Sequence, residues 1–145
     1  MTINNFTVGK DLTFNLYDPM SGGVVSFPII TGFDRKQLVT KLHSKAMSGR
    51  NYYGTEYDGW ELSITIDRST AAADRFFAQR EAAYHGGQNM QEMTITETIQ
   101  EKDGTITQFR YEGVDLSFDD AGTFKNGALV QQRVSGRASR RVLVN

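Results

Sequence analysis

Apolar and polar residues alternate with a period of two along most of this chain, most clearly in the run WELSITID at residues 60–67. In an extended backbone, one face of this run carries the four apolar residues Trp60, Leu62, Ile64 and Ile66. A strand with one apolar face must lie in a sheet that packs this face against a second layer. The alternation therefore commits the chain to a layered β-fold and predicts mainly antiparallel sheets.

The same alternation continues on either side of this run. DLTFNLYD at residues 11–18 predicts an earlier strand, and QEMTITETIQEKDGTITQFRYEG at residues 91–113 predicts a later hairpin with KDG as its turn. The parity then slips, because Tyr111 is an odd position whereas Val114 is an even one. A β-bulge at Glu112–Gly113 would account for the slip.

One segment changes to a helical period, STAAADRFFAQREAAYHGG at residues 69–87. Ser69 or Thr70 is a suitable N-cap, and Gly86–Gly87 ends the run. The stripe predicted to pack on a sheet consists of Ala73, Phe76, Phe77, Ala83 and Tyr84. The order of the elements predicts a single domain over residues 1–145, mainly β, with an antiparallel β-sandwich or barrel and one flanking α-helix.

Composition and charge exclude several classes of protein. The formal net charge is −1 and the isoelectric point is near 6.1, so nothing draws the whole chain to nucleic acid or to a membrane. The chain has no cysteine, which excludes disulfides and thiolate metal sites. No apolar run approaches the roughly 20 residues that span a bilayer, and the start MTINNFTVGK lacks a signal-peptide pattern. We therefore expect a soluble, intracellular product with no membrane partner.

The residues that carry chemistry in enzymes form no recognisable constellation in this sequence. His43 and His85 lie in different predicted elements, and there is no phosphate-binding loop or nucleophile elbow. Asp119–Asp120 could act as paired carboxylates, but their place on a turn beside Gly122 favours ordinary solvated residues. We therefore predict no catalytic residue, no metal site and no cofactor, and we expect that the protein is not an enzyme.

Charge is distributed unevenly toward the C-terminus. Residues 91–120 carry eight acids and two bases, whereas residues 121–145 carry five bases and no acid. These bases either pair with acids inside one sheet or meet an acidic surface on a neighbouring subunit. A phosphate-binding tail is a less favoured alternative, because no aromatic stacking platform accompanies the arginines. The candidates for pairing between subunits are Arg133, Arg137, Arg140 and Arg141.

The segment SKAMSGRNYYGTEYDGW at residues 44–60 separates two alternating runs and is long for a hairpin connection. We interpret Ser44–Gly59 as a long loop that is ordered by contact, because its tyrosines are costly to leave in water. Its glycines would let it follow a neighbouring backbone. We therefore predict self-assembly with another copy of the protein through Arg50, Asn51, Tyr52, Tyr53, Thr55 and Tyr57.

The layout as a whole resembles that of phage tail tube proteins. The resemblance rests on a β-rich chain of about this length with an Ala-rich helix, ADRFFAQREAAYHGGQ, after a strand that ends in TIDRS. The long segment before that strand and the Arg-bearing end VQQRVSGRASRRVLV add to it. The tubes of contractile machines such as pyocins and the Hcp protein of type VI secretion are similar, so the resemblance implies a ring-forming, Hcp-like tail-tube fold.

The resemblance also implies a structural virion protein. Family members form six-membered rings whose sheets close into one inner barrel with the helix outside, and a long loop typically reaches a neighbouring subunit or ring. The rings stack into the tail tube that conducts DNA during ejection. The implied partners are further copies of the chain, a sheath protein if the tail is contractile, a tape-measure protein and DNA in the lumen, and baseplate and terminator proteins at the ends. The implied location is the virion tail, assembled in the host bacterial cytoplasm.

A lumen that conducts DNA should not adhere to it, so the resemblance leads us to expect polar or acidic side chains there. The alternating runs supply as candidates Thr94, Thr96, Glu97, Glu112 and Asp115. Two other interpretations stay open. One is a tail-terminus or baseplate protein of the same fold. The other is a small-ligand-binding β-barrel in which the pocket is lined by Trp60, Phe109 and Phe118.

Overall fold

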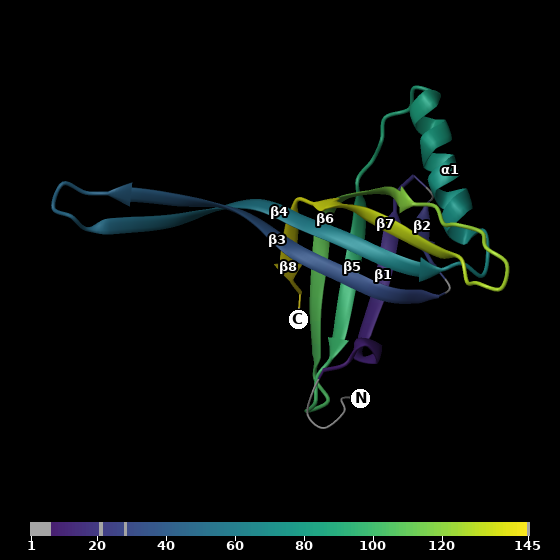
Figure 1. Cartoon of the computed structure of the whole chain (residues 1–145), viewed down its shortest axis with the longest axis horizontal. Coiled ribbons are helices and arrows are strands. Elements are labelled where there is room, and N and C mark those ends of the chain that lie inside the picture. Colours follow the sequence, from purple (N-terminus) through teal and green to yellow (C-terminus); the bar gives the residue numbers. More distant parts are fainter. Residues whose placement is uncertain (1–6, 21, 28, 145) are drawn as a thin grey trace.

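Two packed β-sheets, a helix at one end and a long two-stranded arm make up the protein (Figure 1). The structure is a computed structural model that describes residues 7–20, 22–27 and 29–144. Its elements in chain order are the 3₁₀ helix η1 (Gly9–Asp11), β1 (Leu12–Asp18), β2 (Gly23–Val25), β3 (Ile30–Lys45), β4 (Asn51–Asp67), α1 (Ala72–His85), β5 (Met93–Gln100), β6 (Ile106–Asp120), β7 (Gln131–Ala138) and β8 (Arg140–Leu143). The predicted antiparallel β-fold with one flanking helix is confirmed.

A single strand, β6, joins the two sheets. Its residues 106–114 pair with β5 and β8, and its residues 115–120 pair with β7. We call β2-β1-β5-β6-β8 the five-stranded sheet and β6-β7-β4-β3 the four-stranded sheet. Neighbouring strands in both sheets are antiparallel. Because β6 belongs to both sheets, it lets them fold over one core.

The bend in β6 lies at the predicted bulge. The register of β6 against β5 shifts between Tyr111 and Val114, which confirms the bulge at Glu112–Gly113. Gly113 has a φ of 65°, a left-handed conformation that glycine adopts without strain. A Cβ at this position would also lie 2.4 Å from Ser139 Oγ. Glycine therefore allows the strand to turn from one sheet into the other.

The C-terminal segment, predicted as one extended strand, is divided between the sheets. β7 ends at Ala138 in the four-stranded sheet, and β8 begins at Arg140 in the five-stranded sheet. At the crossing, the Ser139 N–H donates a hydrogen bond of 2.9 Å to the Glu112 carbonyl oxygen. The chain thus passes between the sheets twice, in β6 and after β7, and both crossings meet at the same corner.

The core lies between the two sheets. Leu62, Ile64 and Ile66 face into it, which confirms the alternation of this run, and Trp60 packs against its margin. Fully burying one such aliphatic side chain contributes about 1.5–3 kcal/mol. The largest side chains without exposed surface include Leu16, Leu62, Ile64, Met93, Ile95, Tyr111, Val114 and Val134. They come from both sheets, so each sheet covers the apolar face of the other.

Helix α1 covers one end of the sandwich (Figure 1). It spans Ala72–His85 and ends before the predicted glycines. Its buried residues are Ala73, Phe76, Phe77 and Arg80. The Phe77 ring centroid lies 4.7 Å from that of Phe118 on β6. Tyr84 is exposed, so its predicted place in the packed stripe is wrong, and Arg80 occupies the buried position one turn earlier.

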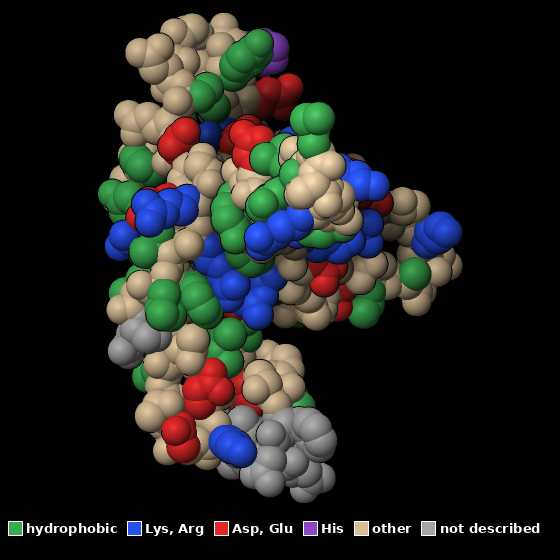
Figure 2. Space-filling model, turned by 90° about the vertical axis from the view of Figure 1, so that its left-hand side faces the viewer, with side chains coloured by type: hydrophobic (Ala, Val, Ile, Leu, Met, Phe, Trp, Pro, Cys, Tyr) green, Lys and Arg blue, Asp and Glu red, His purple; other side chains and the backbone are tan. Residues whose placement is uncertain are grey.

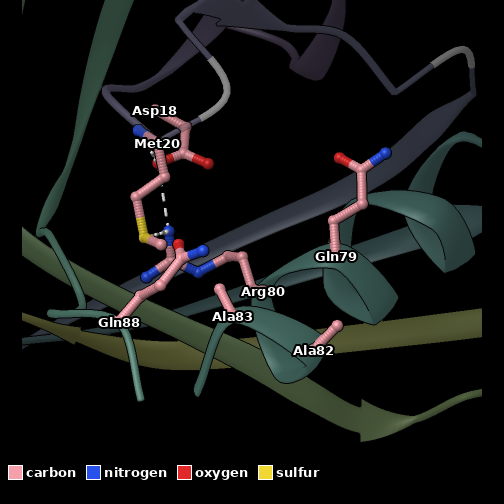
Figure 3. Close-up of a pocket in the computed structure, with 7 residues that line it drawn as sticks. All are labelled: Asp18, Met20, Gln79, Arg80, Ala82, Ala83 and Gln88. Atoms are coloured by element: carbon pink, nitrogen blue, oxygen red, sulfur yellow. Dashed lines mark hydrogen bonds and ion pairs between the residues drawn. The ribbon is translucent and has the colours of Figure 1, made fainter. Parts of the chain in front are cut away.

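Arg80 anchors the helix through a buried ion pair. Its Nη1 lies 3.0 Å from Asp18 Oδ1 at the end of β1, and its Nη2 donates to the Gln91 carbonyl oxygen at 3.1 Å. Figure 3 shows Arg80, Asp18 and Met20 converging, whereas Gln79 lies apart from them. Because a buried charge without its partner is strongly destabilising, this contact fixes α1 on β1.

Strands β3 and β4 form one continuous hairpin that extends far beyond the body (Figure 1). Their pairing continues to Lys45 opposite Asn51, so the turn is confined to residues 46–50. The prediction of a loop over Ser44–Gly59 is therefore wrong, because this segment is the distal part of a hairpin. We call residues 39–58 the arm. With solvent on both faces, a ribbon needs no alternation of apolar and polar residues, and so the sequence pattern did not reveal it.

Candidate assembly surfaces

The arm is exposed along its length. Of residues 39–58, Ala46 is half-buried and all the others are exposed. Tyr53 and Tyr57 keep 77% and 72% of their surface accessible. The predicted assembly residues all lie here, on the turn or on β4: Arg50, Asn51, Tyr52, Tyr53, Thr55 and Tyr57. A two-stranded ribbon is marginal by itself in water, and exposed aromatic surface of this kind is typical of a protein-binding surface.

The arm has two different faces, because directly opposite residues of a hairpin share a face. On one face the His43 and Tyr53 rings stack with centroids 5.0 Å apart, and His43 Nε2 lies 3.0 Å from Asn51 Oδ1. We call this the tyrosine face, and its residues include Val39, Lys41, His43, Asn51, Tyr53, Thr55 and Tyr57. Tyr52 lies on the opposite face, with the Arg50 guanidinium 4.8 Å above its ring. The structure thus divides the predicted assembly residues between both faces.

Basic and hydrophobic side chains lie together at the end of the molecule to which the arm points. Figure 2 views the molecule from that end and shows them side by side near the centre, with acidic side chains above and below.

Side-chain hydrogen bonds join the two strands of the arm. Lys41 Nζ donates to Thr55 Oγ1 at 3.2 Å, and the Thr40 hydroxyl donates to Asp58 at 2.5 Å. Such short polar contacts order the ribbon without covering its apolar surface.

The arm leaves the body at a bulge beside a buried glycine. The register of β3 against β4 shifts between Leu38 and Val39, so Asp58 is the extra residue on β4. Gly59 has a φ of 101°, and a Cβ there would lie 2.5 Å from the Ala138 carbonyl oxygen. Glycine fits both this conformation and this close approach. The boundary between arm and body is therefore set by backbone geometry.

Arg141, a predicted partner for acids of a neighbouring subunit, packs within its own protomer. Its guanidinium carbon lies 3.5 Å from the Phe109 ring centroid and 4.8 Å from a ring centroid of Trp60. Burial lowers the pKa of the Arg141 guanidinium, with Tyr111 acting against this shift and Arg35 adding to it. These contacts hold β8 against the base of the arm. Pairing with another subunit would require Arg141 to leave the rings.

Glu97 is fully buried in the core, so its predicted place on a lumen is wrong. It accepts a hydrogen bond of 2.7 Å from the Tyr111 hydroxyl and forms an ion pair with Arg35 of β3. The physical reason is the alternation of β5, which places Glu97 on the same face as the buried Ile95. Burial raises the pKa of the Tyr111 hydroxyl, while the positive charges of Arg141 and Arg35 act in the opposite direction. The cluster ties the edge strand β3 to the other sheet.

The other predicted lumen residues lie on two separate outer faces. Thr94 and Thr96 alternate with buried residues of β5 and therefore lie on the outer face of the five-stranded sheet. Glu112 lies near its bend, with an oxygen 2.8 Å from Arg110. Asp115 lies on the outer face of the four-stranded sheet. One protomer does not bring these four residues onto one surface, and their place in a lumen stays a prediction.

Arg133 and Arg137 lie among acids of their own sheet. Arg137 is directly opposite Glu61 on one side and Asp115 on the other, and Arg133 is directly opposite Asp120. This arrangement supports the interpretation in which oppositely charged strands are neighbours within one sheet. Among the side chains that the structure describes, no ion pair joins these arginines to the acids opposite them. Pairing between subunits stays a prediction for Arg133, Arg137 and Arg140.

Neither a metal-binding cluster nor a membrane-spanning helix is found among the described residues. No group of His, Asp and Glu side chains in that part of the chain could hold a metal ion. His43 lies on the arm, whereas His85 lies at the end of α1. No helix within the described ranges is long and apolar enough to cross a membrane.

The aromatic residues of the ligand-barrel interpretation do not line one pocket together. Trp60 and Phe118 pack against the core, and Phe109 lies beneath Arg141. A cavity of about 710 Å³ does lie between β1 and β3, and its apolar lining consists of Leu12, Phe14, Phe27, Ile30 and Phe33. This cavity involves none of the three aromatic residues that the sequence singled out.

Comparison with known proteins shows that the fold of this chain is similar to that of chains in structures of contractile particles. No protein-family model matches it, and no curated protein is similar to it in sequence. A chain in the extended sheath–tube complex of the extracellular contractile injection system PVC has a TM-score of 0.65 at 8% identity, covering 97% of this chain and 93% of that chain. A chain in the PVC sheath/tube terminator structure has a TM-score of 0.65 at 9% identity, covering 99% and 100%.

A third solved structure adds a chain from a baseplate to the comparison. A chain in the anti-feeding prophage baseplate has a TM-score of 0.62 at 12% identity, covering 99% of this chain and 98% of that chain. At these identities the likeness is one of fold alone. The fold that the resemblance to tail tube proteins implied is confirmed over nearly the whole chain.

Proposed function

We propose that this chain is a structural subunit of a phage or phage-like contractile tail, in which copies form stacked rings that build the inner tube. The observation that carries the proposal is the arm, an exposed aromatic ribbon on a body whose core is complete without it. The likeness in fold to chains of sheath–tube, terminator and baseplate structures supports it. As in the family that the sequence resembles, six copies make one ring.

The arm suits repeated assembly for a physical reason. The surface that it meets on another copy is a different part of the molecule, so the contact is heterologous. Repeated heterologous contacts form a closed ring when the rotation from one subunit to the next adds up to a full turn. Otherwise they continue as an open helical assembly. Covering the exposed rings of Tyr53 and Tyr57 gains about 25 cal/mol for each Å² of apolar surface. A tube of stacked rings uses such a contact at every subunit.

The proposed role is that of a conduit and not of a catalyst. The tube passes DNA during ejection, holds a tape-measure protein before that, and ends on baseplate and terminator proteins. A sheath protein surrounds it if the tail is contractile. The protein is located in the virion tail after assembly in the host bacterial cytoplasm.

A second candidate is a protein that caps or starts such a tube. It is favoured by the likeness to chains in terminator and baseplate structures, which reach TM-scores similar to that of the sheath–tube complex. A subunit of this kind would form a ring that does not extend into a tube.

Negative-stain electron microscopy of the purified protein over a range of concentrations separates these candidates. We expect stacked rings or tubes that become more frequent as the concentration rises. Isolated rings that never stack would favour the terminator or baseplate role. A monomer at every concentration would contradict both.

An arm-shortened variant tests the arm itself. Replacing Thr40–Glu56 with Asn-Gly leaves Val39 opposite Tyr57 across a two-residue turn. Because no residue removed belongs to the core, we expect the free energy of unfolding to stay within about 1 kcal/mol of the unmodified chain. Ring or tube formation should be lost. Loss of the fold would show instead that the arm is part of the core.

A matched pair of point variants controls for general loss of exposed aromatic surface. Tyr53→Ser on the arm and Tyr84→Ser on the helix each remove one exposed tyrosine. We expect Tyr53→Ser to weaken assembly and Tyr84→Ser to leave it unchanged. Equal effects would mean that exposed tyrosines act without regard to place, and the arm would lose its special role.

A further inference from the structure

A cavity of about 340 Å³ lies where the arm leaves the body. Its walls come from two distant parts of the sequence, because Tyr57 and Trp60 belong to β4 whereas Arg140 and Arg141 belong to β8. Figure 1 shows β8 beside the base of the arm. The volume lies within the range of roughly 300–1,000 Å³ that is usual for pockets that hold small molecules.

The aromatic walls of this cavity keep surface that a ligand can cover. Tyr57 has 72% of its surface accessible, and Trp60 is half-buried at the margin of the core. Neither side chain is closed off by the rest of the protomer. A planar ring of a ligand can stack on aromatic surface of this kind.

The two arginines of the cavity are not neutralised within the described part of the chain. No acid among the described side chains forms an ion pair with Arg140 or Arg141. Glu112 is directly opposite Arg140, but its carboxylate oxygen lies 2.8 Å from Arg110 instead. The Arg141 Nε is buried and has no hydrogen-bond partner among the described residues. Because an N–H without a partner costs free energy, these side chains favour an incoming acceptor.

Stacking on aromatic rings leaves the Arg141 guanidinium able to bind an anion. Its carbon lies 3.5 Å from the Phe109 ring centroid, so one flat face of the group is covered. The N–H donors of a guanidinium point outward in its own plane, and stacking does not use them. The rings also hold the group in place, which lowers the ordering cost of binding. A small ligand that enters the cavity can therefore reach this charge where it lies.

We propose that this cavity binds a nucleoside phosphate, either free or as part of a single strand of nucleic acid. The phosphate lies against Arg140 and Arg141, and the base stacks on Tyr57 beside Trp60. Arginine binds phosphate through parallel N–H donors, and aromatic side chains stack with every kind of base. Gln37 also lines the cavity, and its amide can both donate to and accept from a base edge. Such a site is additional to the proposed tube role and does not depend on it.

Folding supplies the aromatic platform that the C-terminal arginines lack in the sequence. The run VQQRVSGRASRRVLV contains no aromatic residue, which made phosphate binding the less favoured interpretation. The structure brings Tyr57 and Trp60 beside these arginines from the other half of the chain. Arginines beside aromatic rings are typical of sites for single-stranded nucleic acid. An acidic side chain alone would leave the two rings uncovered, so the cavity favours a planar anion.

Fluorescence titration tests the proposal directly, because Trp60 is the only tryptophan of the chain. Adenosine monophosphate is added to the full chain at a concentration where sedimentation velocity shows no assembly. We expect saturable quenching with a dissociation constant of about 0.1–1 mM, which calorimetric titration should reproduce. Molar salt should weaken the binding, because it screens the exposed Arg140. No saturable change by either method up to about 10 mM would overturn the proposal.

A matched pair of tyrosine variants tests the stacking wall. Tyr57→Ser removes a ring from the cavity, whereas Tyr53→Ser removes an exposed ring from the same face of the arm farther from the body. We expect Tyr57→Ser to raise the dissociation constant at least about fivefold and Tyr53→Ser to leave it unchanged. Equal effects would overturn the role of Tyr57. Circular dichroism and urea denaturation check that each variant is folded.

A matched pair of arginine variants tests the phosphate contact. Arg140→Gln removes a charge from the cavity, and Arg133→Gln removes the same charge from the outer face of the four-stranded sheet. We expect Arg140→Gln to raise the dissociation constant at least about tenfold, because hydrogen bonds to charged groups are the stronger ones. Arg133→Gln should leave it unchanged. Equal weakening by both variants would show attraction to net charge and would overturn the site.

Partial and alternative ligands identify the chemistry that the cavity recognises. Adenosine lacks the phosphate and inorganic phosphate lacks the base, so each should bind at least about tenfold more weakly than adenosine monophosphate. Inorganic phosphate that binds as tightly would overturn the role of the rings. A short oligoadenylate that binds more tightly would assign the ligand to a single strand, and one that binds more weakly would assign it to the free nucleotide. A glutamate-rich peptide that displaces adenosine monophosphate at equal concentration would overturn the assignment in favour of an acidic protein partner.

Discussion

The two halves of the β3–β4 hairpin share one pattern of backbone pairing but differ in everything around it. In the body, Leu62, Ile64 and Ile66 have between 0% and 2% of their surface exposed. There β7 pairs with the other edge of β4, and the five-stranded sheet covers one face. In the arm, residues 39–58, both faces are open to solvent and neither edge is paired within the described protomer.

The comparison shows that backbone pairing alone does not make a stable sheet. An exposed hydrogen bond contributes little net free energy, because water offers a similar one to the unfolded chain. The body half gains its stability from buried side chains and a third strand, neither of which the arm has. The arm therefore lacks the burial that stabilises the body, and its exposed tyrosines do not belong to the core. Their contact with a partner stays a prediction.

The largest expected effect compares one leucine from each half. Leu62→Ala in the body should lower the free energy of unfolding by about 2–5 kcal/mol, because it leaves a cavity among fully buried side chains. Leu42→Ala in the arm removes a half-exposed side chain and should cost less than about 0.5 kcal/mol. Urea denaturation measures both. Similar losses in the two variants would break the distinction between arm and body.

The boundary between the halves gives the next effect. Gly59→Ala forces a side chain into a φ of 101° and against the Ala138 carbonyl oxygen, so we expect a loss of about 1–3 kcal/mol. Gly54→Ala on the arm is the matched control, because its Cβ would meet Leu42 at an ordinary 3.6 Å. The control should change stability by less than about 0.5 kcal/mol. A tolerated Gly59→Ala would mean that the arm's base can shift.

An intermediate effect depends on pH and concerns the buried cluster of Arg35, Glu97 and Tyr111. Burial raises the pKa of Tyr111 above its ordinary value of 10.0, so the folded state favours the protonated hydroxyl. The resulting stability is fully present below pH 10 and is lost as the pH rises through the higher folded pKa. Tyr111→Phe should cost about 1–2 kcal/mol at neutral pH by removing the hydrogen bond to Glu97.

The pH dependence separates Tyr111 from the exposed tyrosines. In urea denaturation above pH 10, the loss of stability with pH should be smaller in Tyr111→Phe than in the unmodified chain. Tyr84→Phe on the exposed face of α1 is the control and should keep the original slope. Identical slopes in all three proteins would show that the Tyr111 hydroxyl does not contribute to alkaline unfolding.

The smallest expected effect lies on the arm. His43→Ala removes the ring stacked on Tyr53, but both residues are exposed and the pair covers little core surface. We expect the free energy of unfolding to fall by less than about 0.5 kcal/mol. A fall of more than about 1 kcal/mol in urea denaturation would show that the arm folds together with the body and not beside it.

Local patterns predicted several elements correctly. The alternation in residues 60–67 predicted which side chains of β4 are buried, and the parity slip predicted the bulge at Glu112–Gly113. The helix was predicted from its composition and from the glycines that end it, whereas its N-cap is Ala71 and not the predicted Ser69 or Thr70. The loop over Ser44–Gly59 was wrong, because a ribbon exposed on both faces leaves no periodic signal. Tyr84 was misplaced, because helical spacing alone does not say where the packed surface ends.

Among the candidate site residues, too, local patterns predicted some features correctly and missed others. The tyrosines of the arm were predicted to be surface for a partner because large aromatic side chains are unusual in a solvated segment. The structure shows them exposed, and their contact with a partner stays a prediction. Glu97 was misassigned because an acidic residue in a strand is usually expected to face solvent. Here its carboxylate is buried in the core, where it forms an ion pair with Arg35 and accepts a hydrogen bond from the Tyr111 hydroxyl. Arg141 was read as free for pairing, and only the aromatic rings beside it explain its position.

By itself the sequence determined the features that depend on near neighbours: the strand faces, the helix, the bulge and the exposed tyrosines. Tertiary structure alone decided which strands lie side by side. It thereby decided the row of directly opposite charges that crosses the four-stranded sheet through Lys36, Glu61, Arg137 and Asp115. The physical reason is that periodicity arises from residues two to four positions apart. A row across a sheet joins residues far apart in the chain, which meet only through the register of four strands.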